Sequence, residues 1–294
     1  MILMSPPVHL GKTAEERAAF LQKVKLMEVK TVTTNTPADW NDADVEEAKQ
    51  FLDDHGIRVG EFSGHQGGFG SADPEEYRAA IEGHRHQLRH AHIIGAHCIA
   101  CAILIGRIWI DEMPKTFAER GGTIPPMWSE ETWKRCIGAV QELMPFAEEF
   151  EMDVAIHPHI ITPVYSVERY QELFDAVPSP RLKALFDPVN MTGPHMFLRM
   201  TEFINEIFDG IGEKIVTMHA KDATMWLAQP ISIISRVDEA VPGTGMMDYA
   251  TILRRLDALE NDVPVHVEHF PELETIAGQQ YIRHVGREIG VTIG

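Results

Sequence analysis

Short apolar runs rich in β-branched residues alternate along this chain with longer stretches of helical periodicity, eight times over. The runs predict strands at residues 2–5, 30–34, 57–62, 98–104, 153–157, 183–187, 215–219 and 264–269. The stretches between them predict helices near residues 13–26, 43–55, 74–92, 129–150, 166–176, 198–209, 247–258 and 274–289. Eight such units in 294 residues, with no linker rich in Ser, Pro or Gly, predict an α/β chain forming a single (β/α)8 TIM barrel domain over residues 1–294.

The competing architecture is a doubly wound open sheet. No expected strand is followed by a G-x-G-x-x-G or G-x-x-x-x-G-K turn, so the usual nucleotide-binding loops of such sheets are absent from the sequence. Two strand-to-helix segments, 105–128 and 220–246, are long and rich in Gly, Pro, Trp and Met. In a barrel they lie at the C-terminal ends of the strands, which is where barrel enzymes build their active sites.

The charge balance argues against polyanionic partners. The formal net charge is −18, and a surface this acidic repels phosphate backbones and anionic lipid headgroups, so we expect neither nucleic acid nor a membrane as partner. No run approaches the roughly 18 apolar residues of a membrane-spanning helix, and we expect a cytoplasmic protein. Cys98 and Cys101 form a C-x-x-C within an expected strand, where residues three apart face opposite ways; we expect buried, reduced thiols.

Four consecutive expected strands end in residues able to bind a metal ion: His157, Asp187, His219 and Glu268. Alternation along each strand places these side chains on the barrel axis. In the strand at 215–219, for example, Val216 and Met218 are expected to face outward, whereas Thr217, His219 and Lys221 face inward.

The alternative reading of each tip residue is a cap or a surface side chain. Inward charges gathered at one barrel mouth need pairing or a counter-ion, so together they favour a metal site. Two imidazoles and two carboxylates suit one divalent ion, Mn²⁺, Co²⁺, Fe²⁺ or Zn²⁺, better than Mg²⁺ or Ca²⁺, which prefer oxygen ligands only. Such an ion could act as a Lewis acid on a substrate carbonyl or hydroxyl.

The stretches "FDPVN", "MHAKD", "VPGTGMMDY" and "VHVEHF", in this strand order, resemble the xylose isomerase-like TIM barrels, the sugar phosphate isomerase/epimerase family. The resemblance covers nearly the whole chain. It implies one divalent ion, often Mn²⁺, held by Glu, Asp, His and Glu on four consecutive strands. Asp187, His219 and Glu268 match three of these positions.

The fourth position departs from the family pattern. The family usually has Glu-x-His where this chain has His157-Pro158-His159, so His157 replaces a metal-binding Glu and His159 matches the His. In family epimerases the two metal-bound glutamates move the proton on opposite faces of the substrate carbon, so this loss puts two-base epimerisation in doubt.

We expect a metal-dependent isomerase or epimerase of carbohydrate metabolism, acting by proton abstraction beside a polarised carbonyl to give an enediolate. The alternative is a lyase that uses the same intermediate for β-elimination, such as cleavage of keto-glycosides or C-glycosides, or dehydration. His159 as base, Glu268 and Lys221 are the expected catalytic residues; for Lys221 an ion pair with Asp187 or Asp222 is the structural alternative.

Five further residues at or beyond the strand tips are expected to contact the sugar, and core packing or structural burial is the alternative for them: Glu61, His65, Asn190, Trp109 and Trp226. Four histidines in "GHRHQLRHAH", residues 83–92, belong to an expected outer helix, and we expect a solvated helix face there.

Two other classes of function are alternatives to a sugar-converting enzyme. Apurinic-site nucleases share this barrel, but they need a basic DNA groove and further inward histidines, which the sequence does not offer. A non-catalytic barrel subunit is the other class. We expect a homo-oligomer, and a hetero-oligomer with a small partner subunit is the alternative.

Overall fold

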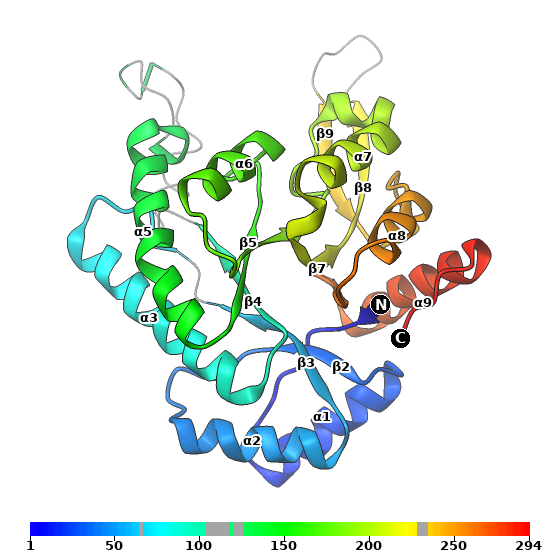
Figure 1. The fold of residues 1–294 in the computed structure, drawn as a ribbon. Helices are drawn as coiled ribbons and strands as arrows, with labels where there is room; N and C mark the ends of the chain where they lie inside the picture. Colours follow the sequence, from blue (N-terminus) through cyan, green and yellow to red (C-terminus); the bar gives the residue numbers. More distant parts are fainter. Residues whose placement is uncertain (65–66, 104–117, 120, 122–125, 228–234) are drawn as a thin grey trace.

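The chain, analysed as a computed structural model, forms the expected barrel; the structure describes residues 1–64, 67–103, 118–119, 121, 126–227 and 235–294 (Figure 1). Eight parallel strands make one sheet in the order β1-β10-β7-β6-β5-β4-β3-β2. Their bounds are β1 Ile2–Met4, β2 Thr31–Thr34, β3 Arg58–Ser63, β4 Cys98–Ala102, β5 Asp153–His157, β6 Leu182–Phe186, β7 Ile215–Ala220 and β10 Val263–Val267. The predicted (β/α)8 fold is confirmed.

The barrel is nearly closed where its first two strands meet. A parallel bridge joins Pro7 to Thr33, just beyond β1. The Val8 N–H donates to the Thr33 carbonyl at 2.9 Å, and the Thr33 N–H donates to the Pro6 carbonyl at 2.9 Å. The C-terminal segment also lies against β1, since the Gly294 N–H donates to the Ile2 carbonyl.

The helices surround the strands, and local sequence sets where they begin (Figure 1). Thr13 and Glu16 form a capping box before α1, and Ser129 caps the first turn of α5 by accepting from the Thr132 N–H. Their bounds are α1 Ala14–Leu26, α2 Asp42–Asp54, α3 Pro74–Ile94, α5 Glu130–Glu149, α6 Val167–Ala176, α7 Met200–Ile211, α8 Tyr249–Asp257 and α9 Glu272–Ile289. None of the helices in the described ranges is both long and apolar enough to span a membrane.

Apolar side chains fill two separate regions. The large cluster lies between strands and helices, and it contains Cys101 and Met218. A small second cluster joins Cys98, Ala100, Ala155, Leu185 and Val216. Cys98 and Cys101 fall into different clusters, as expected for residues three apart on a strand, and both are buried free thiols.

The prediction that Val216 faces outward is wrong. Ala184 pairs with Ile215 and Leu185 pairs with Thr217, so Val216 is an extra residue in the ladder between β6 and β7. A bulge of this kind shifts the alternation locally. Val216 therefore joins the second cluster, while Met218 faces outward as predicted.

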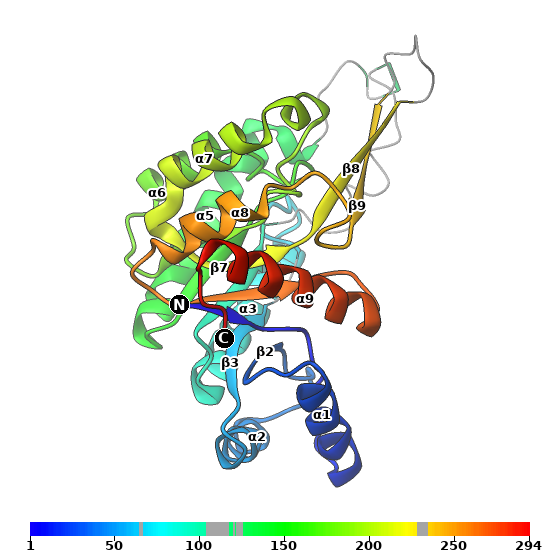
Figure 2. The same ribbon diagram turned by 90° about the vertical axis from the view of Figure 1, so that its right-hand side faces the viewer.

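A two-stranded hairpin follows β7 and was not predicted. Strands β8 (Asp222–Leu227) and β9 (Ser235–Ala240) pair in antiparallel register from Asp222 opposite Ala240 to Leu227 opposite Ser235. Figure 2 shows this hairpin rising away from the barrel at the end of β7. It lies over the C-terminal ends of the strands and so changes what surrounds the site.

The motif "VPGTGMMDY" holds the base of the hairpin. Both Asp222 carboxylate oxygens accept backbone N–H groups, from Gly243 at 2.9 Å and from Met247 at 2.8 Å. A Cβ at Gly245 would lie 2.3 Å from the Asp222 carboxylate and 2.5 Å from the Ala223 carbonyl, so this close approach requires glycine. The motif is thus explained by packing at the barrel mouth.

The helix α3 histidines differ from expectation. His84 and His90 are fully buried, so the expected solvated face is wrong for these two residues. His90 Nδ1 lies 2.8 Å from the Thr36 hydroxyl, a hydrogen bond that satisfies this one ring nitrogen within the core.

Candidate metal centre

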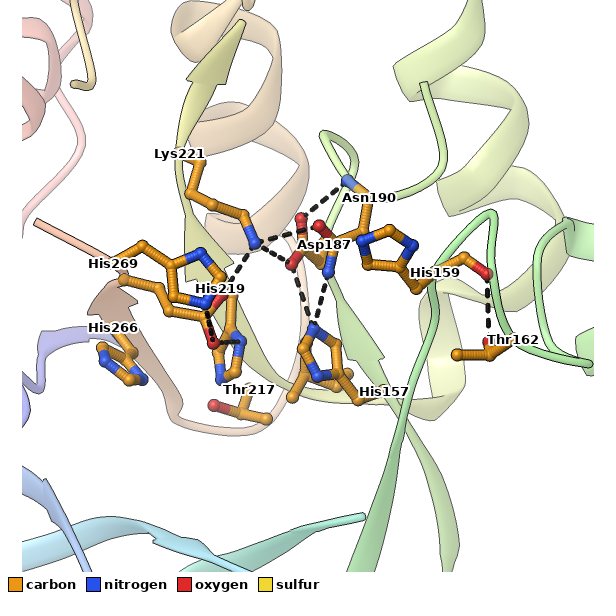
Figure 3. Close-up of polar contacts among 12 residues, drawn as sticks. His157, His159, Thr162, Asp187, Asn190, Thr217, His219, Lys221, His266 and His269 are labelled. Atoms are coloured by element: carbon orange, nitrogen blue, oxygen red, sulfur yellow. Dashed lines mark hydrogen bonds and ion pairs between the residues drawn. The ribbon is translucent and has the colours of Figure 1, made fainter. Parts of the chain in front are cut away.

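The structure brings the four strand-tip residues together. His157 ends β5, Asp187 follows β6, His219 lies in β7 and Glu268 follows β10. Each offers one donor atom, and these four atoms lie within 4.8 Å of one another. His157 Nε2 lies 3.1 Å from Asp187 Oδ2, and His219 Nδ1 lies 3.2 Å from Glu268 Oε1 (Figure 3).

Lys221 places its ammonium group among the same atoms. Its Nζ lies 2.8 Å from Asp187 Oδ2 and 2.7 Å from Glu268 Oε2, and it is buried. Burial by itself would raise the pKa of Asp187, but the positive charge of Lys221 and a hydrogen bond from His157 outweigh it and lower that pKa to about 2. Burial likewise opposes the charge of Glu268, whose pKa is nevertheless lowered, chiefly by His219.

The charges fit one divalent ion. The two carboxylates of the group, Asp187 and Glu268, match the charge of one divalent ion when His157 and His219 bind as neutral imidazoles. The donor set, two imidazole nitrogens and two carboxylate oxygens, is also one that transition-metal ions accept.

Glu61 is buried next to His219. It is 1% exposed, and its oxygens lie 3.0 and 3.2 Å from His219 Nε2. The Thr217 hydroxyl donates to it at 2.7 Å. The expected contact between Glu61 and sugar hydroxyls does not fit this placement; Glu61 instead holds His219 Nε2, which leaves Nδ1 free to face an ion.

His266 joins Glu61 and His219 in a second group of possible ligands. It is buried, its ring nitrogens have no hydrogen-bond partner among the residues that the structure describes, and Nδ1 lies 3.8 Å from Glu61 Oε1. This second group has one carboxylate, that of Glu61, and therefore offers less negative charge to a divalent ion than the first group does. The sequence analysis did not select His266, although it lies two residues before Glu268 and therefore faces the same side.

Asn190 is buried and contacts two residues of the site, His157 and Lys221. Its Nδ2 lies 2.9 Å from His157 Nε2, its Oδ1 accepts from Lys221 Nζ at 3.0 Å, and it is 5% exposed. The amide nitrogen of Asn190 needs the Nε2 lone pair, whereas the contact with the Asp187 carboxylate needs a proton on Nε2, so only one of these two hydrogen bonds forms at a time. An ion bound to Nε2 needs the lone pair and would take the place of the Asn190 contact.

His159 is held by its own loop in a defined tautomer. The Ile161 N–H donates to His159 Nδ1 at 3.1 Å, so Nδ1 carries a lone pair and the proton of the neutral ring is on Nε2. Burial lowers the pKa of His159 to about 4. Figure 3 shows its ring beside Asn190. A neutral ring with its proton on Nε2 donates a hydrogen bond, which differs from the expected role of His159 as a base.

Glu239 and His269 form an outer group that the sequence analysis missed. Glu239 comes from β9, and its Oε2 lies 2.9 Å from His269 Nδ1. His269 Nε2 lies 3.5 Å from Glu268 Oε1, and the His269 backbone has φ 70°, a left-handed conformation that is uncommon for residues other than glycine. The hairpin delivers Glu239, so no signal short of predicting the hairpin would have found it.

Three other residues were expected to contact the substrate, and the structure describes one of them, Trp226. Trp226 lies on β8 and is 60% exposed. His65 and Trp109 lie outside the described residues.

The fold and the site together define a class: a (β/α)8 barrel with a candidate centre for one divalent ion at the C-terminal ends of its strands. The chain belongs to the xylose isomerase-like TIM barrel family, whose profile matches residues 21–285. The resemblance inferred from the motifs is confirmed.

Three known proteins are similar to this chain in sequence or in fold. An inosose dehydratase of Geobacillus thermodenitrificans (strain NG80-2) is 25% identical over 173 residues, which cover 54% of this chain and 56%, about half, of that protein. A structure of L-ribulose 3-epimerase has a TM-score of 0.66 at 15% identity and covers 99% of this chain and 94% of its own. A barrel protein from Mycobacterium smegmatis, in complex with magnesium, has a TM-score of 0.70 at 15% identity, covering 94% and 90%.

Proposed function

We propose that this protein is a metal-dependent enzyme that acts on a keto-sugar or a related cyclic ketone by removing the proton next to the carbonyl. The observation that carries the proposal is the convergence of His157, Asp187, His219 and Glu268 at the barrel mouth. A divalent ion bound there, with Mn²⁺ expected first, would supply a Lewis acid for the carbonyl oxygen.

Three residues of the chain have different roles in the proton transfer. Glu268, which is 14% exposed at the barrel mouth, takes the proton from the substrate carbon. His159 donates a hydrogen bond from Nε2 to the oxygen that gains negative charge, because its Nδ1 is occupied by the Ile161 N–H. Lys221 provides a positive charge for the same developing anion.

A single acid–base carboxylate favours elimination over two-base epimerisation. In the elimination, Glu268 takes the proton, the electrons of the C–H bond form the enolate, and the enolate expels the β-hydroxyl. Glu268 then returns its proton to the departing oxygen, so water leaves and the carboxylate is restored. The match to an inosose dehydratase supports this reading, and the epimerase folds support epimerisation as the second candidate.

The test is turnover by the Mn²⁺-loaded protein of an inosose and of a panel of unphosphorylated keto-sugars, followed by ultraviolet absorbance and proton NMR in D₂O. We expect metal-dependent formation of an unsaturated ketone. Formation of an epimer with solvent deuterium would replace elimination by epimerisation. No exchange and no product with any substrate would overturn the proposal and leave a non-catalytic barrel.

The role of His159 has its own test. His159→Gln keeps a donor near the position of Nε2 but has no basicity, whereas His159→Phe has neither. We expect His159→Phe to lower kcat by about 10²–10³-fold, the usual cost of removing one such donor. We expect His159→Gln to retain most of the activity, and its complete inactivity would restore His159 to the role of base.

A further inference from the structure

The Lys221 ammonium contacts two of the four residues that would bind the proposed ion. It bridges Asp187 and Glu268, which belong to the strands on either side of β7. A divalent ion bound by these carboxylates competes with Lys221 for the same oxygen lone pairs and repels its charge. Metal binding therefore requires Lys221 to find another partner.

We propose that Glu239 is a positioning residue that receives the Lys221 ammonium when a divalent ion displaces it. The inference rests on the proposed function, because it concerns the same metal centre. It assigns a purpose to the hairpin β8–β9, which delivers Glu239 to the barrel mouth.

The geometry around Glu239 supports this assignment. Its Oε1 lies 3.6 Å from Lys221 Nζ, too far for a hydrogen bond in the present arrangement but within reach of a small movement of the lysine. Its other oxygen is held by His269 at 2.9 Å, which fixes the carboxylate in place. Glu239 is also outside the candidate ligand set, so it keeps a free oxygen when the ion is bound.

The displacement has a consequence for catalysis. While Lys221 contacts Asp187 and Glu268, its positive charge is paired with these two carboxylates of the ligand set. Held by Glu239 instead, the ammonium is released from the ligand set and can contact a substrate oxygen. Glu239 thereby couples metal binding to the placement of the buried Lys221 ammonium.

The test is the affinity of metal-stripped protein for Mn²⁺ alone, measured by calorimetric titration. We expect Glu239→Gln to weaken Mn²⁺ binding by about tenfold, the lower end of the usual cost of losing an outer partner of a metal site. Lys221→Met is expected to bind Mn²⁺ more tightly, by about tenfold or more, because a like charge is removed. Asp238→Asn is the matched control: Asp238 is the preceding residue on β9 and pairs with Arg236 on the exposed surface.

The double variant separates positioning from simple charge loss. If Glu239 acts through Lys221, then Glu239→Gln has little effect in the Lys221→Met background. Should Lys221→Met fail to fold, Glu239→Asp keeps the acceptor and is expected to bind Mn²⁺ close to wild type.

Two results would overturn the inference while leaving the metal centre intact: equal Mn²⁺ affinity of Glu239→Gln and Asp238→Asn, or an equal loss in both backgrounds. Absence of Mn²⁺ binding by the wild type would overturn the proposed function as well.

Discussion

The inward-facing side chains of the barrel form two layers, and the same strands contribute to both. The lower layer is apolar and contains Cys98, Ala100, Ala155, Leu185 and Val216. The upper layer, at the C-terminal ends of the strands, is charged and contains the candidate ligands and Lys221. The lower layer consists of packed apolar side chains, whereas the upper layer gathers charged groups that need pairing or a counter-ion.

The largest expected effect is on the upper layer without metal. Lys221→Met leaves Asp187 and Glu268 buried and without their ammonium partner. We expect a loss of about 3–5 kcal/mol in the free energy of unfolding of metal-stripped protein, measured by urea denaturation. Added Mn²⁺ should recover a large part of this loss, and a variant as stable as wild type without metal would show that the two layers do not differ as described.

A matched change in the lower layer should behave differently. Leu185→Ala removes a fully buried side chain, and we expect it to cost about 2–5 kcal/mol in the same denaturation experiment. Because no charge is involved, the cost should be the same with and without Mn²⁺. A cost that changes with Mn²⁺ would mean that the layers are coupled.

Metal itself should stabilise the wild type by mass action. At a free Mn²⁺ concentration one hundred times the dissociation constant, we expect about 2.7 kcal/mol of added stability. Leu185→Ala should gain the same increment, and Asp187→Asn should gain far less because it lacks a ligand. The Tm measured with and without Mn²⁺ gives this comparison directly, and an equal gain in Asp187→Asn would remove Asp187 from the ligand set.

Of the two layers, acid should act on the upper one. The pKa of Asp187 is lowered from 3.8 to about 2, so its ionised form stabilises the folded state above pH 3.8, and this contribution is lost as the pH falls through 2. Unfolding of metal-free protein between pH 4 and 2 should therefore be steeper for wild type and Leu185→Ala than for Asp187→Asn; equal slopes would contradict the assignment.

The sequence was sufficient to predict the barrel and the strand tips because both follow from periodicity. The alternation of short apolar runs with helical stretches identified all eight strands of the barrel. The positions that face the barrel axis, together with the family motifs, selected His157, Asp187, His219 and Glu268. Each of these signals is a property of a single strand or helix and does not depend on how the elements pair.

What could not be predicted depends on pairing between elements. The bulge at Val216 reflects the register between β6 and β7, and the hairpin joins two segments of the long stretch after β7. Glu61 was selected for substrate, yet its partner His219 comes from a strand 158 residues later in the chain. The tautomer of His159 depends on a single backbone N–H, that of Ile161.

The central claim is that the charged layer holds one divalent ion, and elemental analysis of the purified protein tests it most directly. Wild type and Leu185→Ala, after reloading with Mn²⁺ and removal of excess metal, should each contain about one divalent ion per chain. Asp187→Asn should contain far less. Wild type without bound metal after reloading, or Asp187→Asn with a full equivalent, would contradict the account.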